Sequence, residues 1–76
     1  MSEPHIRKAR TAIALAATAV DGAATTLPPG EWFVEQHAGL VLVFGDPQGA
    51  QPVASLAVVD FLDGLARRDI VFVSWG

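Results

Sequence analysis

The sequence predicts a small α/β fold of the α+β type. We expect a two-layer sandwich in the order α-β-β-α-β, with two helices on a three-stranded mixed sheet. The helices are predicted by two stretches whose apolar residues recur every three or four positions. The strands are predicted by three short stretches that are apolar throughout or alternate between apolar and polar residues. A chain of 76 residues is long enough for one domain, so we expect residues 1–76 to form a single domain.

The first helix is expected over residues 3–21. Five apolar residues recur there at helical spacing: Ile6, Ala9, Ile13, Ala16 and Val20. Ser2 can cap this helix and Gly22 can end it. Three basic residues lie in its first turns: Arg7, Lys8 and Arg10. These residues are interpreted either as a solvated helix end or as a docking point for an acidic partner.

A linker and a hairpin are expected next. Residues 22–30 end in Pro-Pro-Gly, which disfavours helix and predicts a linker with a turn. Residues 31–37 alternate as in a strand, with Trp32, Val34 and Gln36 on one face. Residues 40–44 are apolar on both faces, which is typical of a central strand. The short connection between the two strands favours an antiparallel hairpin.

A second helix and a last strand complete the predicted fold. Residues 52–68 have an apolar arc opposite a polar one, and Asp63 and Arg67 are spaced for an ion pair along a helix. Gly64 lies inside this helix, which indicates close packing or simple tolerance. Residues 70–75 are apolar on both faces and predict a strand. Because a helix separates it from residues 40–44, we expect the two strands to be parallel, with a right-handed crossover.

The predicted sheet has a second apolar face that two helices on one side would leave open. Phe33, Val43 and Trp75 are candidates for that face. A patch of several hundred Å² is unusual on a monomer without a function. The helices could cover one face each, or a different protein could cover the open face. We expect a homodimer, because a chain this short gains stability from association.

The charge distribution argues against nucleic acid as a partner. The net charge is −3, and every charged residue between positions 11 and 66 is acidic: Asp21, Glu31, Glu35, Asp46, Asp60 and Asp63. An acidic body is poorly suited to a phosphate backbone. We therefore expect no direct binding of nucleic acid, and a basic partner surface for the acidic middle of the chain.

Several compartments and chemistries are disfavoured by composition. The absence of cysteine excludes disulfides and thiolate metal sites. No apolar run is long enough for a membrane span, so we expect no membrane association. The N-terminus has the basic residues, the apolar run and the small-x-small motif of a secretion signal. However, its apolar run is weakly hydrophobic, and Glu3 and Pro4 interrupt the basic part, so a cytoplasmic location is expected.

The polar residues predict no catalytic site. Neither Ser55 nor Ser74 is placed near His5 or His37 in the predicted fold, and no phosphate-binding or dinucleotide-binding glycine motif is present. Glu31, Glu35 and His37 share one strand face, which is either a solvated face or part of a metal site. We predict no catalytic residue, no cofactor and no metal.

These observations favour a non-enzymatic, small acidic module that binds and modulates a larger protein or complex. The candidate partner-binding residues are Glu31, Phe33, Glu35, Val43, Asp60, Asp63 and Trp75. Small acidic single-domain proteins of this kind are common among phage and mobile-element inhibitors of host machinery, such as anti-CRISPR proteins, and no sequence motif carries that hypothesis. Two alternatives are a small-ligand binder or enzyme with a site at the dimer interface, and a structural or assembly subunit.

Overall fold

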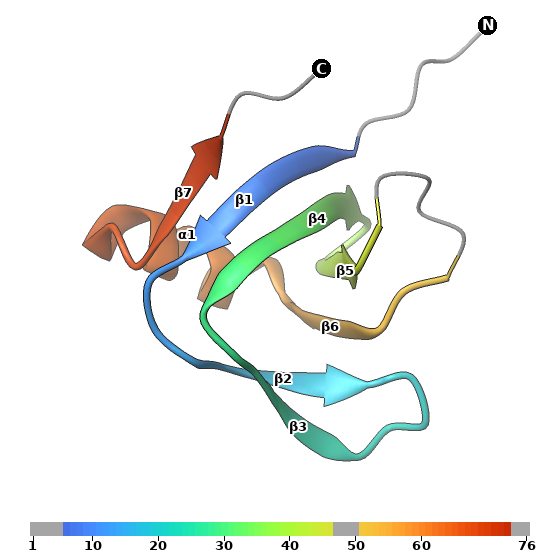
Figure 1. The fold of residues 1–76 in the computed structure, drawn as a ribbon. Coiled ribbons are helices and arrows are strands. Elements are labelled where there is room, and N and C mark those ends of the chain that lie inside the picture. Colours follow the sequence, from blue (N-terminus) through green and yellow to red (C-terminus); the bar gives the residue numbers. More distant parts are fainter. Residues whose placement is uncertain (1–5, 47–50, 74–76) are drawn as a thin grey trace, which may run out of the picture.

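The computed structural model describes residues 6–46 and 51–73, which form one curled sheet and one helix (Figure 1). The elements in this part of the chain are β1 (Arg7–Thr11), β2 (Leu15–Ala19), β3 (Ala24–Leu27), β4 (Gly30–His37), β5 (Leu40–Phe44), β6 (Ala54–Ala57), α1 (Val58–Arg67) and β7 (Ile70–Val73). The predicted sandwich of two helices on a three-stranded mixed sheet is therefore wrong. The fold is mostly antiparallel sheet in the shape of a half-barrel.

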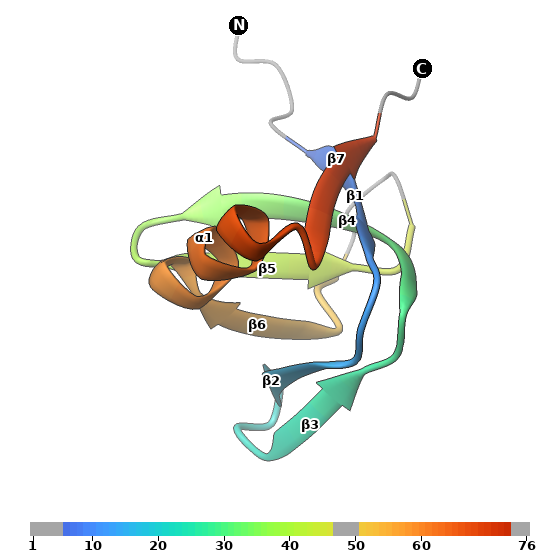
Figure 2. The same ribbon diagram turned by 90° about the vertical axis from the view of Figure 1, so that its left-hand side faces the viewer.

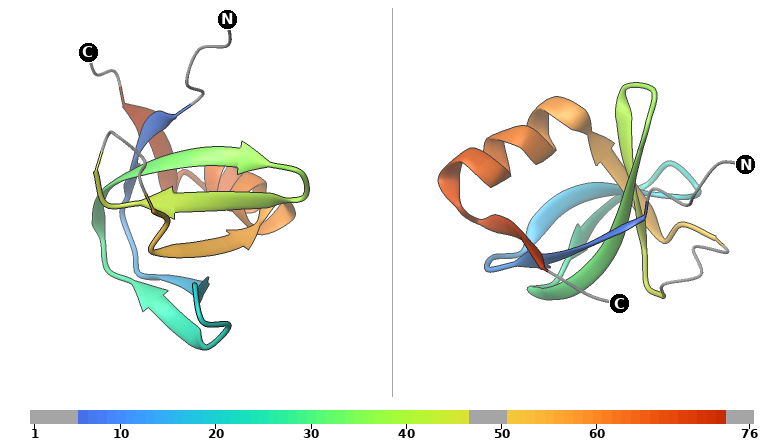
Figure 3. Two further views of the ribbon diagram at one scale, coloured as in Figure 1. Left: turned by 90° about the vertical axis from the view of Figure 1, so that its right-hand side faces the viewer. Right: turned by 90° about the horizontal axis from the view of Figure 1, so that it is seen from above.

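The seven strands of the described residues lie in the order β3-β2-β6-β5-β4-β1-β7, and every pairing is antiparallel. β1 pairs with β4 and β2 pairs with β3, so these four strands form one long hairpin that bends between its two halves. Beyond the bend, β2 also pairs with β6, which curls the sheet (Figure 3). The predicted parallel pairing is wrong as well, because β7 pairs antiparallel with β1 and not with β5.

The predicted first helix is replaced by β1 and β2. In β1 the buried positions alternate, with Ala9 and Thr11 facing the core. In β2, Ala17 is half-buried and its neighbours Ala16 and Thr18 are exposed. Alanine is small enough to satisfy either a helical or an alternating pattern, so the spacing of three and four did not discriminate between them. Pairing with β4, β3 and β6 decides in favour of strands.

The predicted linker contains a turn and a strand. Gly22 has φ +91°, and its N–H donates to the carbonyl of Ala19 at 2.9 Å, within the tight turn between β2 and β3. β3 then begins at Ala24. The prolines follow β3 at the bend of the long hairpin, where a residue without a backbone N–H removes no sheet hydrogen bond.

The predicted hairpin of residues 31–37 and 40–44 is confirmed as β4 and β5. Their register pairs His37 with Leu40 across the turn. The two-sided apolar pattern of β5 is also confirmed: Val41 and Val43 belong to the core on the inner face, and Leu42 alternates to the outer face.

The predicted second helix is correct only in its C-terminal part. Its first residues form β6, and α1 begins at Val58, whose N–H donates to the carbonyl of Gly39 at 3.1 Å. At the other end, Arg68 adopts φ +66° and the N–H of Asp69 donates to the carbonyl of Gly64 at 3.0 Å. This arrangement satisfies the last carbonyls of the helix.

α1 lies against the concave inner face of the sheet (Figure 2), and the core lies between them. Its buried members are Ala9, Leu27, Val34, Val41, Val43, Ala54, Leu56, Phe61 and Ile70. Gly64 lets α1 approach β7 closely: an added Cβ would lie 2.9 Å from Ile70 Cγ1 and closer still to Cδ1. The glycine inside the helix is therefore explained by close packing.

Candidate functional site

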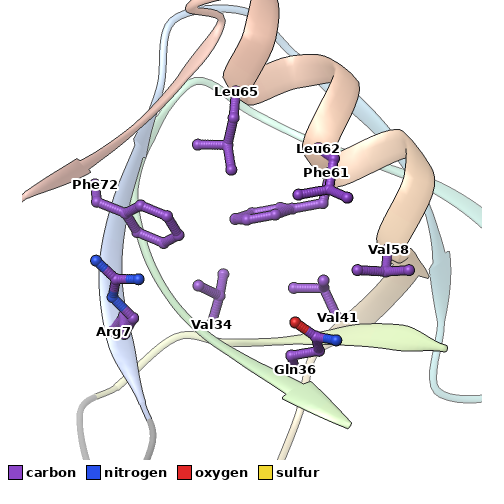
Figure 4. Close-up of a pocket in the computed structure, with 9 residues that line it drawn as sticks. All are labelled: Arg7, Val34, Gln36, Val41, Val58, Phe61, Leu62, Leu65 and Phe72. Atoms are coloured by element: carbon purple, nitrogen blue, oxygen red, sulfur yellow. The ribbon is translucent and has the colours of Figure 1, made fainter. Parts of the chain in front are cut away.

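An apolar hollow of about 440 Å³ opens between α1 and the inner face of the sheet (Figure 4). Its lining residues come from β1, β4, β5, α1 and β7: Arg7, Val34, Gln36, Val41, Val58, Phe61, Leu62, Leu65 and Phe72. All of them except Arg7 and Gln36 are apolar. We call this feature the helix–sheet hollow.

The wall formed by the sheet follows from strand alternation. Val34 and Gln36 are two residues apart on β4, so both point inward. Arg7 of β1 is paired with Val34 in the sheet register and faces the same side. The wall formed by the helix follows from helical spacing, because Val58, Phe61, Leu62 and Leu65 recur at three, four and seven positions.

Phe72 and Arg7 meet at one end of the hollow. The Arg7 guanidinium carbon lies 3.7 Å from the centroid of the Phe72 ring, which is a cation–π contact. The Phe72 ring in turn packs on Phe61, with centroids 5.8 Å apart and ring planes tilted by 53°. The hollow therefore has an aromatic end with a positive charge above it, and no acidic residue lines it.

The two other basic residues of β1 have a carboxylate partner on the outer face. Lys8 Nζ lies 2.9 Å from Glu31 Oε1, and Arg10 Nη2 lies 3.0 Å from Glu31 Oε2. The hydrogen bonds from Lys8 and then Arg10 lower the pKa of the Glu31 carboxyl below its ordinary value. Within the described ranges, Arg7 makes no ion pair with an acidic side chain.

The candidate residues from the sequence do not form one surface. Glu31, Phe33 and Glu35 lie together on the outer face of β4, but Glu31 is engaged by the two cations of β1. Asp60 and Asp63 are exposed on α1, which covers the opposite face of the sheet.

Of the two remaining candidates, Val43 is buried and Trp75 is outside the part of the chain that the structure describes. Val43 is 1% exposed and belongs to the core, so a partner does not reach it in this fold. Trp75 lies outside the described residues.

The expected ion pair of α1 is confirmed, with Arg67 Nε 3.1 Å from Asp63 Oδ2.

Sequence reasoning found the apolar arc of α1 but missed the hollow beside it. Val58, Phe61 and Leu65 lie on the apolar arc predicted for residues 52–68, and they pack with the core as well as lining the hollow. The role of Arg7 was hidden by the helical interpretation, although its alternation with Ala9 and Thr11 was a signal for an inward-facing residue of a strand. Nothing in the sequence indicated that Phe72 lies beside β1.

The described residues offer no candidate metal site. Residues 6–46 and 51–73 hold no group of three or more His, Asp or Glu side chains that could share a metal ion. Nor does any helix there have the length and apolar character needed to cross a membrane. The chain has no significant match to a protein-family model, to a curated protein or to a solved structure. The helix–sheet hollow is therefore the feature from which a function can be inferred.

Proposed function

We propose that this chain is a non-enzymatic interaction module that binds a partner protein by receiving one bulky apolar side chain in the helix–sheet hollow. The hollow itself carries this proposal, because its volume of about 440 Å³ lies in the range of binding pockets and its lining is apolar with two polar groups. Such a pocket is large enough for an aromatic or branched side chain.

The rim of the hollow supports a protein partner over an enclosed small ligand. On α1, Leu62 is 57% exposed and Val59, three residues before it, is 66% exposed. Phe72 on the opposite rim is 39% exposed. This apolar surface continues beyond the hollow, and a partner that fills the hollow would cover the rim as well.

The proposal includes a homodimer and a cytoplasmic location, both predicted from the sequence. The outer face of the sheet carries exposed apolar residues, including Leu40 and Val71, which suit contact between two copies. A second copy there would leave the hollow open to another protein. The narrower hypothesis of a phage or mobile-element inhibitor stays a prediction from size and charge.

Selection from a random linear peptide library tests the proposal. The wild-type chain should enrich peptides that share a bulky apolar residue, and Leu62→Ser should abolish this enrichment, because it replaces an apolar wall of the hollow by a hydroxyl. Ile13→Ser is the matched control, since Ile13 is similarly exposed, at 47%, but lies between β1 and β2 and does not line the hollow. Enrichment that survives Leu62→Ser, or no enrichment at all, would contradict the proposal.

A further inference from the structure

We infer that the partner segment is acidic: beside the apolar side chain that fills the helix–sheet hollow, it places an Asp or Glu carboxylate on the guanidinium of Arg7. This inference rests on the proposed function and adds the chemistry of the partner. The sequence left two interpretations of the basic residues near the N-terminus, a solvated end or a docking point for an acidic partner. The inference adopts the docking point and assigns it to Arg7 alone.

Arg7 differs from the other cations of β1 in what it contacts. Lys8 and Arg10 share the carboxylate of Glu31 on the outer face. Arg7 points to the inner face, where the contact that the described residues give it is the ring of Phe72. In a chain with a net charge of −3, a cation on an apolar wall without an ionic partner in the described ranges is complementary to an anionic ligand.

The contact with Phe72, the one that the described residues give Arg7, uses none of the hydrogen-bond donors of Arg7. The guanidinium carbon lies 3.7 Å from the ring centroid, so the cation lies over the ring. A guanidinium stacked in this way presents its N–H groups at its edge, in the fork geometry that matches a carboxylate. The ring thus holds the cation in place without consuming its hydrogen bonds.

Gln36 provides a second polar group on the same wall. Arg7 pairs with Val34 in the register, and Gln36 lies two residues farther along β4 on the same face. Such diagonal neighbours are about 7–8 Å apart, and Figure 4 shows both side chains at the sheet side of the hollow. When Arg7 binds the carboxylate of the partner segment, the side-chain amide of Gln36 is therefore within reach of the peptide group next to that acidic residue. The amide can donate a hydrogen bond to this peptide group or accept one from it.

The opposite wall fixes the orientation of the ligand. The residues of α1 that line the hollow are all apolar. A bound segment consequently has its carboxylate toward the sheet and its bulky side chain toward the helix. The exposed ridge of Val59 and Leu62 extends this apolar wall past the hollow, which a peptide segment covers and a short free carboxylate does not.

The test repeats the library selection with Arg7→Met, which keeps an apolar stem and removes the charge. Wild-type selection should enrich peptides with Asp or Glu next to the bulky apolar residue. Arg7→Met should keep the preference for the apolar residue and lose the preference for the acid. Arg10→Met is the matched control, because Arg10 lies on the same strand but faces outward, and it should leave both preferences unchanged.

The most enriched peptide is then synthesised with its acidic residue as such and as the corresponding amide. Arg7→Met and the acid-to-amide change should each weaken binding by about tenfold, the size expected for one charge-assisted hydrogen-bonded pair. Together they should weaken it no further, because both remove the same interaction.

The outcomes separate this inference from the proposed function. Apolar enrichment without an acidic preference, or an acidic preference that survives Arg7→Met, would overturn the inference and leave the proposed function standing. No enrichment at the hollow would overturn both. If no peptide is enriched and octanoate binds, the ligand is a free apolar carboxylate. If Leu62→Ser dissociates a dimer, the occupant of the hollow is a second copy of the chain. Either result contradicts the acidic partner segment.

Discussion

The basic residues on the two faces of the curled sheet differ in what they contact. On the outer face, Lys8 and Arg10 of β1 both form ion pairs with Glu31 of the paired strand β4. On the inner face, Arg7 of the same strand lies over an aromatic ring at the end of an apolar hollow. Among residues 6–46 and 51–73, the outer cations have an ionic partner within the sheet and Arg7 has none. This difference is the reason for proposing that a partner binds at the inner face, beside the core.

The largest effect is expected from removing the aromatic ring that connects the core to the hollow. Phe61 is 6% exposed and packs among the core residues, whereas Phe33 is half-buried on the outer face. Phe61→Ala should lower the free energy of unfolding by about 3–5 kcal/mol. Phe33→Ala should lower it by less than about half as much, because less of its surface leaves water on folding. Urea unfolding measures both.

Equal losses for the two phenylalanines would break the distinction between a core face and a peripheral face. A chain of this size has a total stability of only about 4–11 kcal/mol. If Phe61→Ala does not fold, Phe61→Leu compared with Phe33→Leu should show the same order.

A smaller loss is expected from Gly64→Ala, which tests how closely α1 lies on β7. The added methyl group overlaps Ile70 and overpacking costs about 1–3 kcal/mol, which exceeds or offsets a gain in helix propensity of about 1 kcal/mol. We expect a lower urea midpoint for Gly64→Ala. Adding Ile70→Val, which removes the nearest atom Cδ1, should restore part of the loss.

Gly39→Ala is the control for this substitution, since an added Cβ there has nothing within 4 Å. Two results would show that the helix does not approach the strand so closely. In the first, Gly64→Ala is as stable as wild type. In the second, adding Ile70→Val to Gly64→Ala lowers the stability further, by the ordinary amount for a lost methyl group.

The smallest effect is expected from the outer ion pairs, through pH. Lys8 and Arg10 hold the pKa of Glu31 below its ordinary value, so the native state binds this proton less tightly than the unfolded chain. The resulting stabilisation is complete above the ordinary glutamate pKa of about 4.3 and is lost as the pH falls through the lowered native value. Glu31→Gln should therefore flatten the loss of stability in acid.

Urea midpoints across the acidic range, from about pH 6 to about pH 3, measure this dependence. Glu35→Gln serves as the control, because Glu35 lies on the same face without an ion pair in the described part of the chain. An acid profile that Glu31→Gln leaves unchanged would mean that the outer charges are not stabilised by their pairing.

The sequence predicted the strands whose residue types discriminate between helix and strand. In β4 and β5, large side chains such as Trp32, Val34 and Val41 make the alternating or two-sided pattern clear. In β1 and β2, alanine fills many positions and fits a helix equally well, so the pairing partners decide the structure. The predicted helix included β6 because Ala54 fits the apolar arc, although Leu56 falls on the polar side of that helix and is buried in the structure.

The candidate site was predicted least well because it depends on long-range pairing. The hollow exists because β1 brings Arg7 beside Val34 and because β7 brings Phe72 beside Ala9. Neither register is encoded in the local pattern of one segment. Once Arg7 was interpreted as part of a helix, its inward direction and its ring partner could not be inferred.

Chemical-shift mapping of the library-selected peptide on the side-chain methyl groups of the full chain tests the binding face most directly, because strand alternation puts side chains on opposite faces. We predict that saturating peptide shifts methyl groups of the hollow, including those of Val34, Val58 and Leu62, and leaves those of Leu42, Val71 and Val73 on the outer face unchanged. Shifts concentrated on the outer face, with the hollow unaffected, would contradict the account.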